Sequence, residues 1–183
     1  MKYFEIQDTP ELKYAPRLQN WYGAFDVRDI GMESYSKLPE RLLFIVEPSE
    51  QTVFTDFILF PFLLVSHKVM DVIKMYKERC YYRDVILLDQ LSGRSEMYCL
   101  PVFDETDRLQ ILEKSGESEV HGETSAKQKL PEVHVNKNIF WVRDFRKRHT
   151  VISLELAESL LRREVFGLGI REVTLFTKEE EKE

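Results

Sequence analysis

The pattern of hydrophobic and polar positions changes from continuous to helical at Ser66. Before it, an apolar run over Phe57–Val65 is interrupted only by Pro61 and is typical of a buried extended segment. After it, apolar residues recur at helical spacing: Val69, Val72, Ile73, Tyr76 and Cys80. A serine hydroxyl at such a junction can accept a hydrogen bond from a free backbone N–H of the first turn. The pattern therefore predicts a buried strand that leads directly into a helix capped by Ser66.

A second serine, Ser153, stands before another helical pattern. The strand-like segment 150–153 leads up to it, and apolar residues then recur at helical spacing. This stripe consists of Leu154, Leu156, Ala157, Leu160, Leu161 and Val165. Gly167 and Gly169 follow, and glycine tolerates the left-handed conformation in which helices often end. The pattern predicts a second serine-capped helix, closed by these glycines.

Other segments rich in β-branched and aromatic residues are typical of strands. Where turn residues separate two such segments, the spacing predicts an antiparallel hairpin. The predicted hairpins are 41–47 with 52–59, and 84–91 with 95–103. Further strands are predicted at 3–7, 138–143 and 171–177. These elements predict an α+β fold with a mainly antiparallel sheet, built from hairpins, and two Ser-capped helices packed on it.

Three regions depart from regular patterns. Residues 1–40 are interrupted by proline and glycine but carry large aromatic side chains, which predicts an irregular arm that covers the core or offers a binding surface. Residues 113–132 are rich in Ser, Gly, Glu and Lys and are predicted to form a mobile acidic loop, or one that orders on binding. Residues 178–183 form a predicted solvated tail. The candidate partner-binding residues are Trp21, Tyr22, Glu113, Glu117, Glu119 and Glu123.

Length and charge narrow the class of protein. A chain of 183 residues suits a single domain with a sizeable core. Its formal net charge of −6 favours solubility and argues against nucleic acid or an anionic membrane as the main partner. Two cysteines form no disulfide framework, and neither a signal peptide nor an apolar run of membrane-spanning length is evident. We expect a cytoplasmic protein; its oligomeric state stays open.

The chain carries few residues in patterns typical of catalysis. Its four histidines do not fall in a metal-binding motif, so we expect no metal and no other cofactor. The acids Asp56 and Asp89 lie in apolar strands, where they either perform acid/base chemistry with His67 or bond to solvent and turns. The basic cluster 143–149 either grips an anionic partner or forms a solvated turn. No catalytic residue is predicted.

Four short motifs carry a resemblance to a known family. They are Asp56-Phe57-Ile58, Leu64-Val65-Ser66, Val151-Ile152-Ser153 and Gly167-Leu168-Gly169-Ile170. Their order resembles that of a family of bacterial immunity proteins, which are encoded beside the polymorphic toxins of contact-dependent or type VI systems. The similarity extends over about residues 42–175. It does not include the aromatic arm or the acidic loop.

The resemblance implies a binding function rather than catalysis. An immunity protein occludes its cognate toxin in the cytoplasm, and the family has no catalytic residues to transfer to this chain. An acidic protein is attracted rapidly to a basic partner, so a nuclease toxin would suit the net charge. Two alternatives remain open: a small enzyme that uses Asp56, His67 and Asp89, and a cytosolic adaptor protein.

Overall fold

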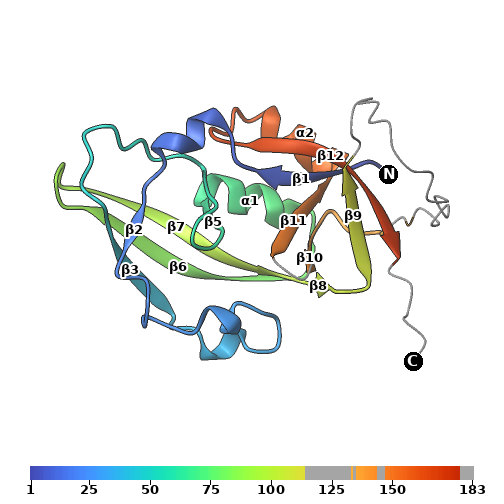
Figure 1. Ribbon diagram of the computed structural model, residues 1–183, viewed down its shortest axis with the longest axis horizontal. Coiled ribbons are helices and arrows are strands. Elements are labelled where there is room, and N and C mark those ends of the chain that lie inside the picture. The colour runs from blue at the N-terminus through green and yellow to red at the C-terminus, as the bar shows by residue number, and fades with distance from the viewer. Residues whose placement is uncertain (114–132, 134, 144–146, 178–183) are drawn as a thin grey trace, which may run out of the picture.

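The computed structural model describes residues 1–113, 133, 135–143 and 147–177. Within these residues the chain forms two α-helices and two six-stranded sheets (Figure 1). The helices are α1 (His67–Met75) and α2 (Leu154–Leu161). Three short 3-10 helices are η1 (Pro10–Tyr14), η2 (Val27–Asp29) and η3 (Tyr35–Lys37). The predicted α+β class is confirmed.

The first sheet is built around the N-terminal strand. Its strands, in spatial order, are β8 (Glu105–Thr106), β10 (Ile139–Arg143), β11 (Arg148–Ser153), β1 (Tyr3–Gln7), β12 (Gly169–Thr177) and β9 (Leu109–Glu113). Strand β1 pairs antiparallel with β11 on one side and β12 on the other, and only β8 and β10 are parallel. The start of the chain is therefore held between two strands from its C-terminal part.

The second sheet is built around the hairpin of β6 and β7. Its strands, in spatial order, are β2 (Leu18–Gln19), β3 (Arg41–Val46), β6 (Cys80–Asp89), β7 (Arg94–Phe103), β5 (Leu64–Ser66) and β4 (Phe57–Ile58). The hairpin predicted at 84–103 is confirmed and starts four residues earlier, at Cys80. Strand β7 then leads into β8 and so joins the second sheet to the first (Figure 1). The strands thus form two mixed sheets, where a single sheet was predicted.

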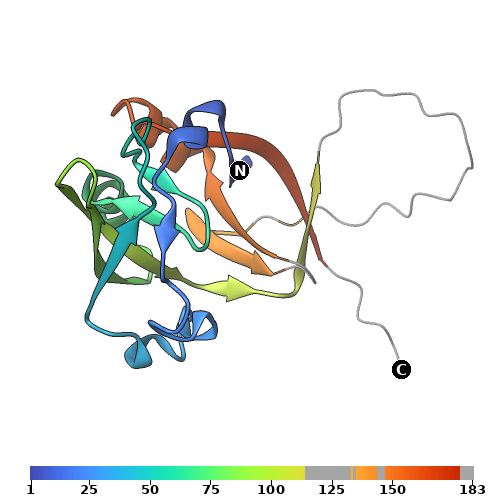
Figure 2. The same ribbon diagram turned by 60° about the vertical axis from the view of Figure 1, so that its left-hand side comes forward.

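The hairpin predicted from residues 41–47 and 52–59 is wrong. Strand β3 pairs with β2 and, in parallel, with β6, whereas β4 pairs with β5 (Figure 2 shows β2 beside β3). The cause lies at Asp56, whose backbone N–H bonds to the carbonyl of Phe166 and whose carbonyl accepts the N–H of Ser66. These two bonds tie the segment to the start of α1 and to the connection between α2 and β12, away from β3.

Both serine caps are confirmed. The hydroxyl of Ser66 accepts the N–H of Val69 at 3.3 Å, and that of Ser153 accepts the N–H of Leu156 at 3.2 Å. Helix α1 ends earlier than its stripe predicted, because Lys77 adopts a left-handed conformation (φ 54°) and Cys80 already belongs to β6.

The predicted glycine closure of α2 is wrong. Helix α2 ends at Leu161, and the first left-handed residue after it is Glu164 (φ 50°), so Val165 lies outside the helix. Gly167 is left-handed (φ 82°) but lies in the connection to β12. Gly169 opens β12 opposite Gln7, where a Cβ atom would collide with backbone oxygen. Its role is close packing of two strands rather than helix termination.

The predicted irregular arm at residues 1–40 is partly regular, since it supplies β1, β2 and the three 3-10 helices. Glu113, predicted in the acidic loop, ends strand β9, and the rest of that loop lies outside the described residues. The tail 178–183 lies outside them too.

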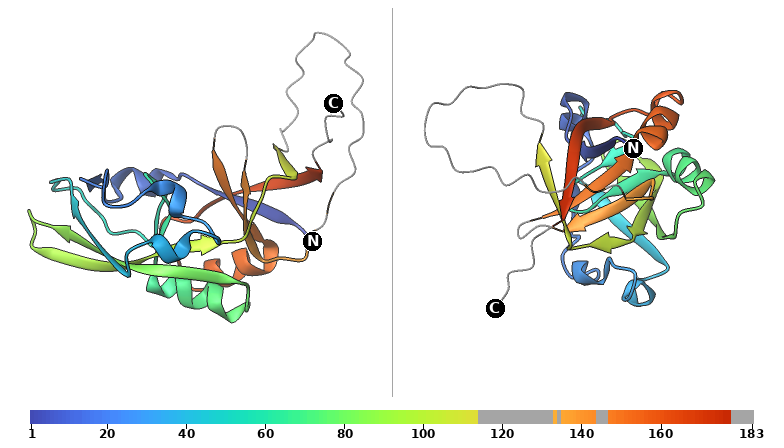
Figure 3. Two further views of the ribbon diagram at one scale, coloured as in Figure 1. Left: turned by 90° about the horizontal axis from the view of Figure 1, so that it is seen from below. Right: turned by 90° about the vertical axis from the view of Figure 1, so that its right-hand side faces the viewer.

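Among the described residues, the larger of two core clusters joins the two sheets and the helices. Its buried residues come from both sheets and both helices, for example Phe44, Leu100, Trp141 and Leu156. Helices α1 and α2 lie side by side (Figure 3), and the hydroxyl of Tyr76 at the end of α1 donates to a backbone oxygen of α2 at 2.7 Å. Among the described residues, the helices are too short to cross a membrane.

Candidate partner-binding groove

An open groove with a volume of about 740 Å³ lies beside the middle of the first sheet. One wall comes from β1 and from the hairpin of β10 and β11. The other comes from η2 and from the connection between β4 and β5, residues 59–63. Its size suits a few side chains of a partner or a small molecule. The groove therefore combines one wall of paired strands with one wall of connecting loops.

One exposed aromatic side chain lines the loop wall, and a second lies next to it. Phe60, which lines the groove, is 74% exposed, and Tyr22 is 79% exposed. Trp21 links them: its ring stacks on that of Tyr22 with centroids 3.7 Å apart and meets the edge of Phe60 at 6.4 Å. Trp21 also packs edge-on against the buried Phe62, which ties the group to the core. Tyr22 and Phe60 are thus held by Trp21, while most of their surface stays exposed to a partner.

The strand wall carries a buried carboxylate, that of Glu5. Arg171 lies directly across the sheet on β12, and its guanidinium is 2.6 Å from the carboxylate. Nδ1 of His149, on β11, lies 2.6 Å from it on the other side, and the ammonium of Lys147 lies at 3.2 Å. Burial raises the pKa of Glu5, but these hydrogen bonds and charges outweigh burial, so its pKa lies below the ordinary value.

The remaining cations of this wall also have acidic partners. Arg143 and Arg148 each approach Glu105 to 2.5 Å, and the guanidinium of Arg148 lies 4.2 Å above the ring of Trp141. Across the groove, Arg28 pairs with Asp26. Each of these cations has an acidic partner, but Glu5 and Glu105 each serve more than one cation, so the described residues of this wall keep an excess of positive charge. For a basic partner, affinity in the groove would therefore depend on burial of aromatic rings rather than on charge.

The predicted partner-binding residues have different outcomes. Trp21 and Tyr22 belong to the aromatic group beside the groove. Glu113 ends β9, where its backbone pairs with Val173. The other three predicted residues, Glu117, Glu119 and Glu123, lie outside the described residues, as does part of the basic cluster, 144–146. The described part of that cluster pairs with Glu5 and Glu105, so it is more than a solvated turn.

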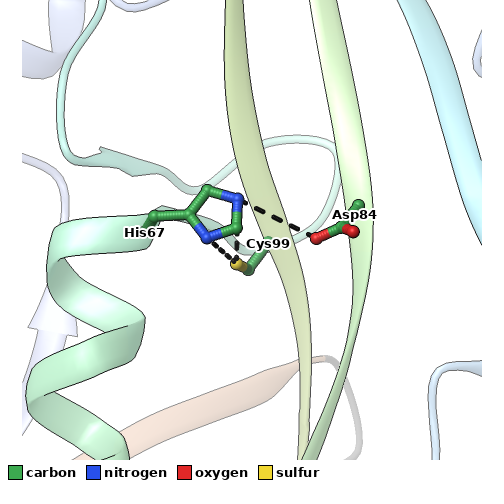
Figure 4. A group of neighbouring side chains, drawn as sticks. All are labelled: His67, Asp84 and Cys99. Carbon is green, nitrogen blue, oxygen red and sulfur yellow. Dashed lines mark hydrogen bonds and ion pairs between the residues drawn. The ribbon is translucent and has the colours of Figure 1, made fainter.

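The three acid/base candidates do not meet in one site. The carboxylate of Asp56 accepts hydrogen bonds from the hydroxyl of Ser66 and the backbone of Phe166. That of Asp89 accepts from residues of the β6–β7 turn, as the alternative interpretation predicted. His67 instead lies beside Asp84 and Cys99 (Figure 4). The carboxylates of Asp56 and Asp89 are therefore both engaged in hydrogen bonds that fix the local fold.

The pair of Cys99 and His67 resembles a nucleophile beside its base, but its properties oppose that role. Cys99 has no exposed surface. Burial, followed by the nearby charge of Asp84, raises the pKa of its thiol to about 12. A cysteine nucleophile acts as the thiolate and needs a lowered pKa and access to its substrate. The arrangement therefore does not favour thiol catalysis.

Sequence reasoning missed Phe60 and Glu5. Phe60 lies in the apolar run that predicted a buried strand, and Pro61, which interrupts this run, was the signal that the chain leaves the sheet there. Glu5 lies in a correctly predicted strand, but its burial depends on cations about 140 to 170 residues away in the chain. No local pattern indicates such a cluster.

No family model, curated protein or solved structure in the comparisons matches this chain.

Proposed function

We propose that this protein is an immunity protein that binds a cognate bacterial toxin in the cytoplasm and neutralises it by occlusion. The observation that carries the proposal is the exposure of Tyr22 and Phe60 beside the groove. Large aromatic side chains that are held rigidly and still exposed are typical anchors of protein interfaces. The resemblance of the serine-helix motifs to immunity proteins supplies the class of partner.

Two further observations support a binding role over turnover. The acid/base candidates Asp56 and Asp89 are engaged in bonds that fix a helix start and a turn. The cations of the groove are paired with Glu5, Glu105 and Asp26. A wall already fixed by ion pairs loses little conformational freedom when a partner packs on it.

The charge of the chain supports rapid association with a basic toxin. With a net charge of −6, the whole molecule attracts a basic partner at long range, although the strand wall of its groove carries more described cations than carboxylates. Steering and docking would then use different surfaces. Association would slow at high salt, whereas dissociation from the aromatic anchors would change little.

The test is to express the product of a toxin gene adjacent to the gene for this chain, with and without this protein. We expect protection of the producing cells and a stable complex of the two purified proteins in size-exclusion chromatography. Continued toxicity together with separate elution would overturn the proposal. Capture of a housekeeping protein instead, with no effect on the toxin, would favour the adaptor.

A further inference from the structure

Three side chains of metal-binding type meet at the start of α1. They are His67, Asp84 and Cys99, and one ligand atom from each lies within 4.8 Å of the other two (Figure 4). Sγ of Cys99 is 3.6 Å from Nδ1 and 3.9 Å from Nε2 of His67. Nε2 lies 3.8 Å from a carboxylate oxygen of Asp84. This group is separate from the groove and from the ion pairs of Glu5.

The fold brings the three residues together from different elements. Asp84 on β6 and Cys99 on β7 are directly paired in the antiparallel register, so their side chains share one face of the sheet. On the other side of β7, Cys99 pairs with Val65. Two residues later α1 begins with His67, which places the imidazole over the same face. The site is therefore fixed by strand pairing and by the helix start.

The separations are close to those of a tetrahedral metal site. Zinc bonds of about 2.0 to 2.3 Å at tetrahedral angles place N, O and S ligand atoms about 3.4 to 3.6 Å apart. The distances of 3.9 and 3.8 Å from Nε2 are only slightly longer. A rotation of the His67 ring would align its lone pair with an ion. Such a rotation is feasible, because the side chain of His67 is 41% exposed.

We propose that His67, Asp84 and Cys99 bind a divalent transition-metal ion of the zinc type, with water in the fourth position. The mixed nitrogen, oxygen and sulfur donor set favours zinc or cobalt over magnesium or calcium, which prefer oxygen ligands. Asp84 is 35% exposed, so an ion can reach the site from solvent beside it. The buried thiol of Cys99 closes the inner side.

Metal binding changes the protonation of the site in a defined way. The S–H bond of Cys99 breaks, a sulfur–metal bond forms, and the proton passes to solvent. The thiolate and the carboxylate together neutralise the two charges of the ion. Because the thiol must lose its proton before the sulfur binds the ion, metal affinity should rise with pH. The bound ion would join the start of α1 to β6 and β7.

The test uses Co²⁺ as a spectroscopic probe with the reduced 183-residue chain. We expect one equivalent of Co²⁺ to produce a thiolate-to-cobalt charge-transfer band and the visible spectrum of a tetrahedral site. One equivalent of Zn²⁺ should abolish both signals and raise the melting temperature. Absence of a saturable signal at one equivalent would overturn the proposal.

Matched variants assign the ligands. Cys99→Ser should remove the charge-transfer band, whereas Cys80→Ser, which alters the other cysteine, should leave it intact. Asp84→Asn should weaken Co²⁺ binding at least about tenfold, the effect expected for a site residue. Asp71→Asn removes the same charge from an exposed position of α1 and should have little effect.

The variant His67→Ala tests the site even if Cys99→Ser fails to fold. The side chain of His67 is 41% exposed, so its removal should leave the core intact. Equal Co²⁺ affinity of the His67→Ala protein and the wild type would contradict the assignment. A charge-transfer band that depends on Cys80 would contradict it as well.

Discussion

The hydroxyl of Ser66 donates a hydrogen bond of 2.5 Å to the carboxylate of Asp56 while it accepts the backbone N–H of Val69. Ser153 has the same arrangement, since it donates to the side-chain oxygen of Asn138 at 2.8 Å and accepts the N–H of Leu156. In both cases a polar side chain from a preceding segment fixes the rotamer of the capping serine. Each helix start is therefore joined to the sheet that leads into it.

Removal of either serine hydroxyl should destabilise the protein. Ser66→Ala and Ser153→Ala each delete an N-cap, which costs about 1 to 2 kcal/mol, and each also leaves a polar partner without its donor. We expect the free energy of unfolding, measured by urea denaturation, to fall by this amount in both variants.

The control for the caps is Ser95→Ala. Ser95 is exposed in β7, so its free energy of unfolding should stay within about 0.5 kcal/mol of the wild type. Losses of the same size at all three serines would contradict the special role of the two caps.

Loss of the buried carboxylate of Glu5 should be more damaging. Glu5→Gln leaves Arg171, His149 and Lys147 without their shared anion. Removal of one partner from a fully buried ion pair costs roughly 3 to 5 kcal/mol. Because Lys147 and Arg171 keep contact with solvent, we expect about 2 to 3 kcal/mol in urea denaturation. Glu96→Gln, in the exposed pair with Arg94, should cost less than about 1 kcal/mol.

The Glu5 cluster should also make stability depend on pH. The native pKa of Glu5 lies below its ordinary value of 4.5, so its contribution is complete above pH 4.5 and is lost as the pH falls through the native pKa. The stabilities of the wild type and Glu5→Gln should therefore converge on acidification. A gap that stays constant down to the lowest pH at which both proteins fold would contradict the ion-pair explanation.

Local patterns predicted much of the fold but not its strand order. The caps at Ser66 and Ser153 and the β6–β7 hairpin are short-range features, so spacing alone sufficed. The parallel pairing of β3 with β6 joins strands separated by a helix, and nothing in 41–59 indicates it. The β-rich segment 52–59 follows 41–47 closely in the sequence, and this proximity predicted a hairpin instead.

The candidate sites likewise depend on contacts between distant parts of the chain, which local sequence patterns do not indicate. Tyr22 was proposed because an aromatic side chain in an irregular segment is notable by itself. The group of His67, Asp84 and Cys99 has no motif, because its members come from a helix start and two paired strands. The strand register and the start of α1 together bring these residues into one group.

The close approach of Gly169 to Gln7 predicts a further sensitive position. A Cβ atom at residue 169 would collide with the backbone oxygen of Gln7 and the side chain of Thr9. Since a backbone atom cannot move aside cheaply, Gly169→Ala should destabilise the protein by about 1 to 3 kcal/mol in thermal or urea unfolding. Gly31→Ala, where the nearest side-chain atom lies at 3.4 Å and the backbone is outside the left-handed region, should change stability by less than about 1 kcal/mol. Equal effects at both glycines would rule out this steric explanation.

The aromatic group beside the groove gives the prediction closest to function. Phe60→Ala and Tyr22→Ala should leave the melting temperature nearly unchanged, because both side chains are mostly exposed. If these rings anchor the toxin, each variant should weaken the complex by about 30-fold, which corresponds to roughly 2 kcal/mol in a binding titration. The loss should lie mainly in the dissociation rate, since the charge that steers association is unchanged.

Leu91→Ala is the matched control for the aromatic variants. Leu91 is also large, apolar and exposed, but it lies at the β6–β7 turn and does not line the groove. Its removal should leave toxin affinity within about twofold of the wild type. Should Leu91→Ala weaken the complex as much as Phe60→Ala does, the toxin would contact the hairpin tip as well and the groove would lose its special role. Wild-type affinity in both aromatic variants would exclude this surface as the binding site, while protection of cells could still be tested separately.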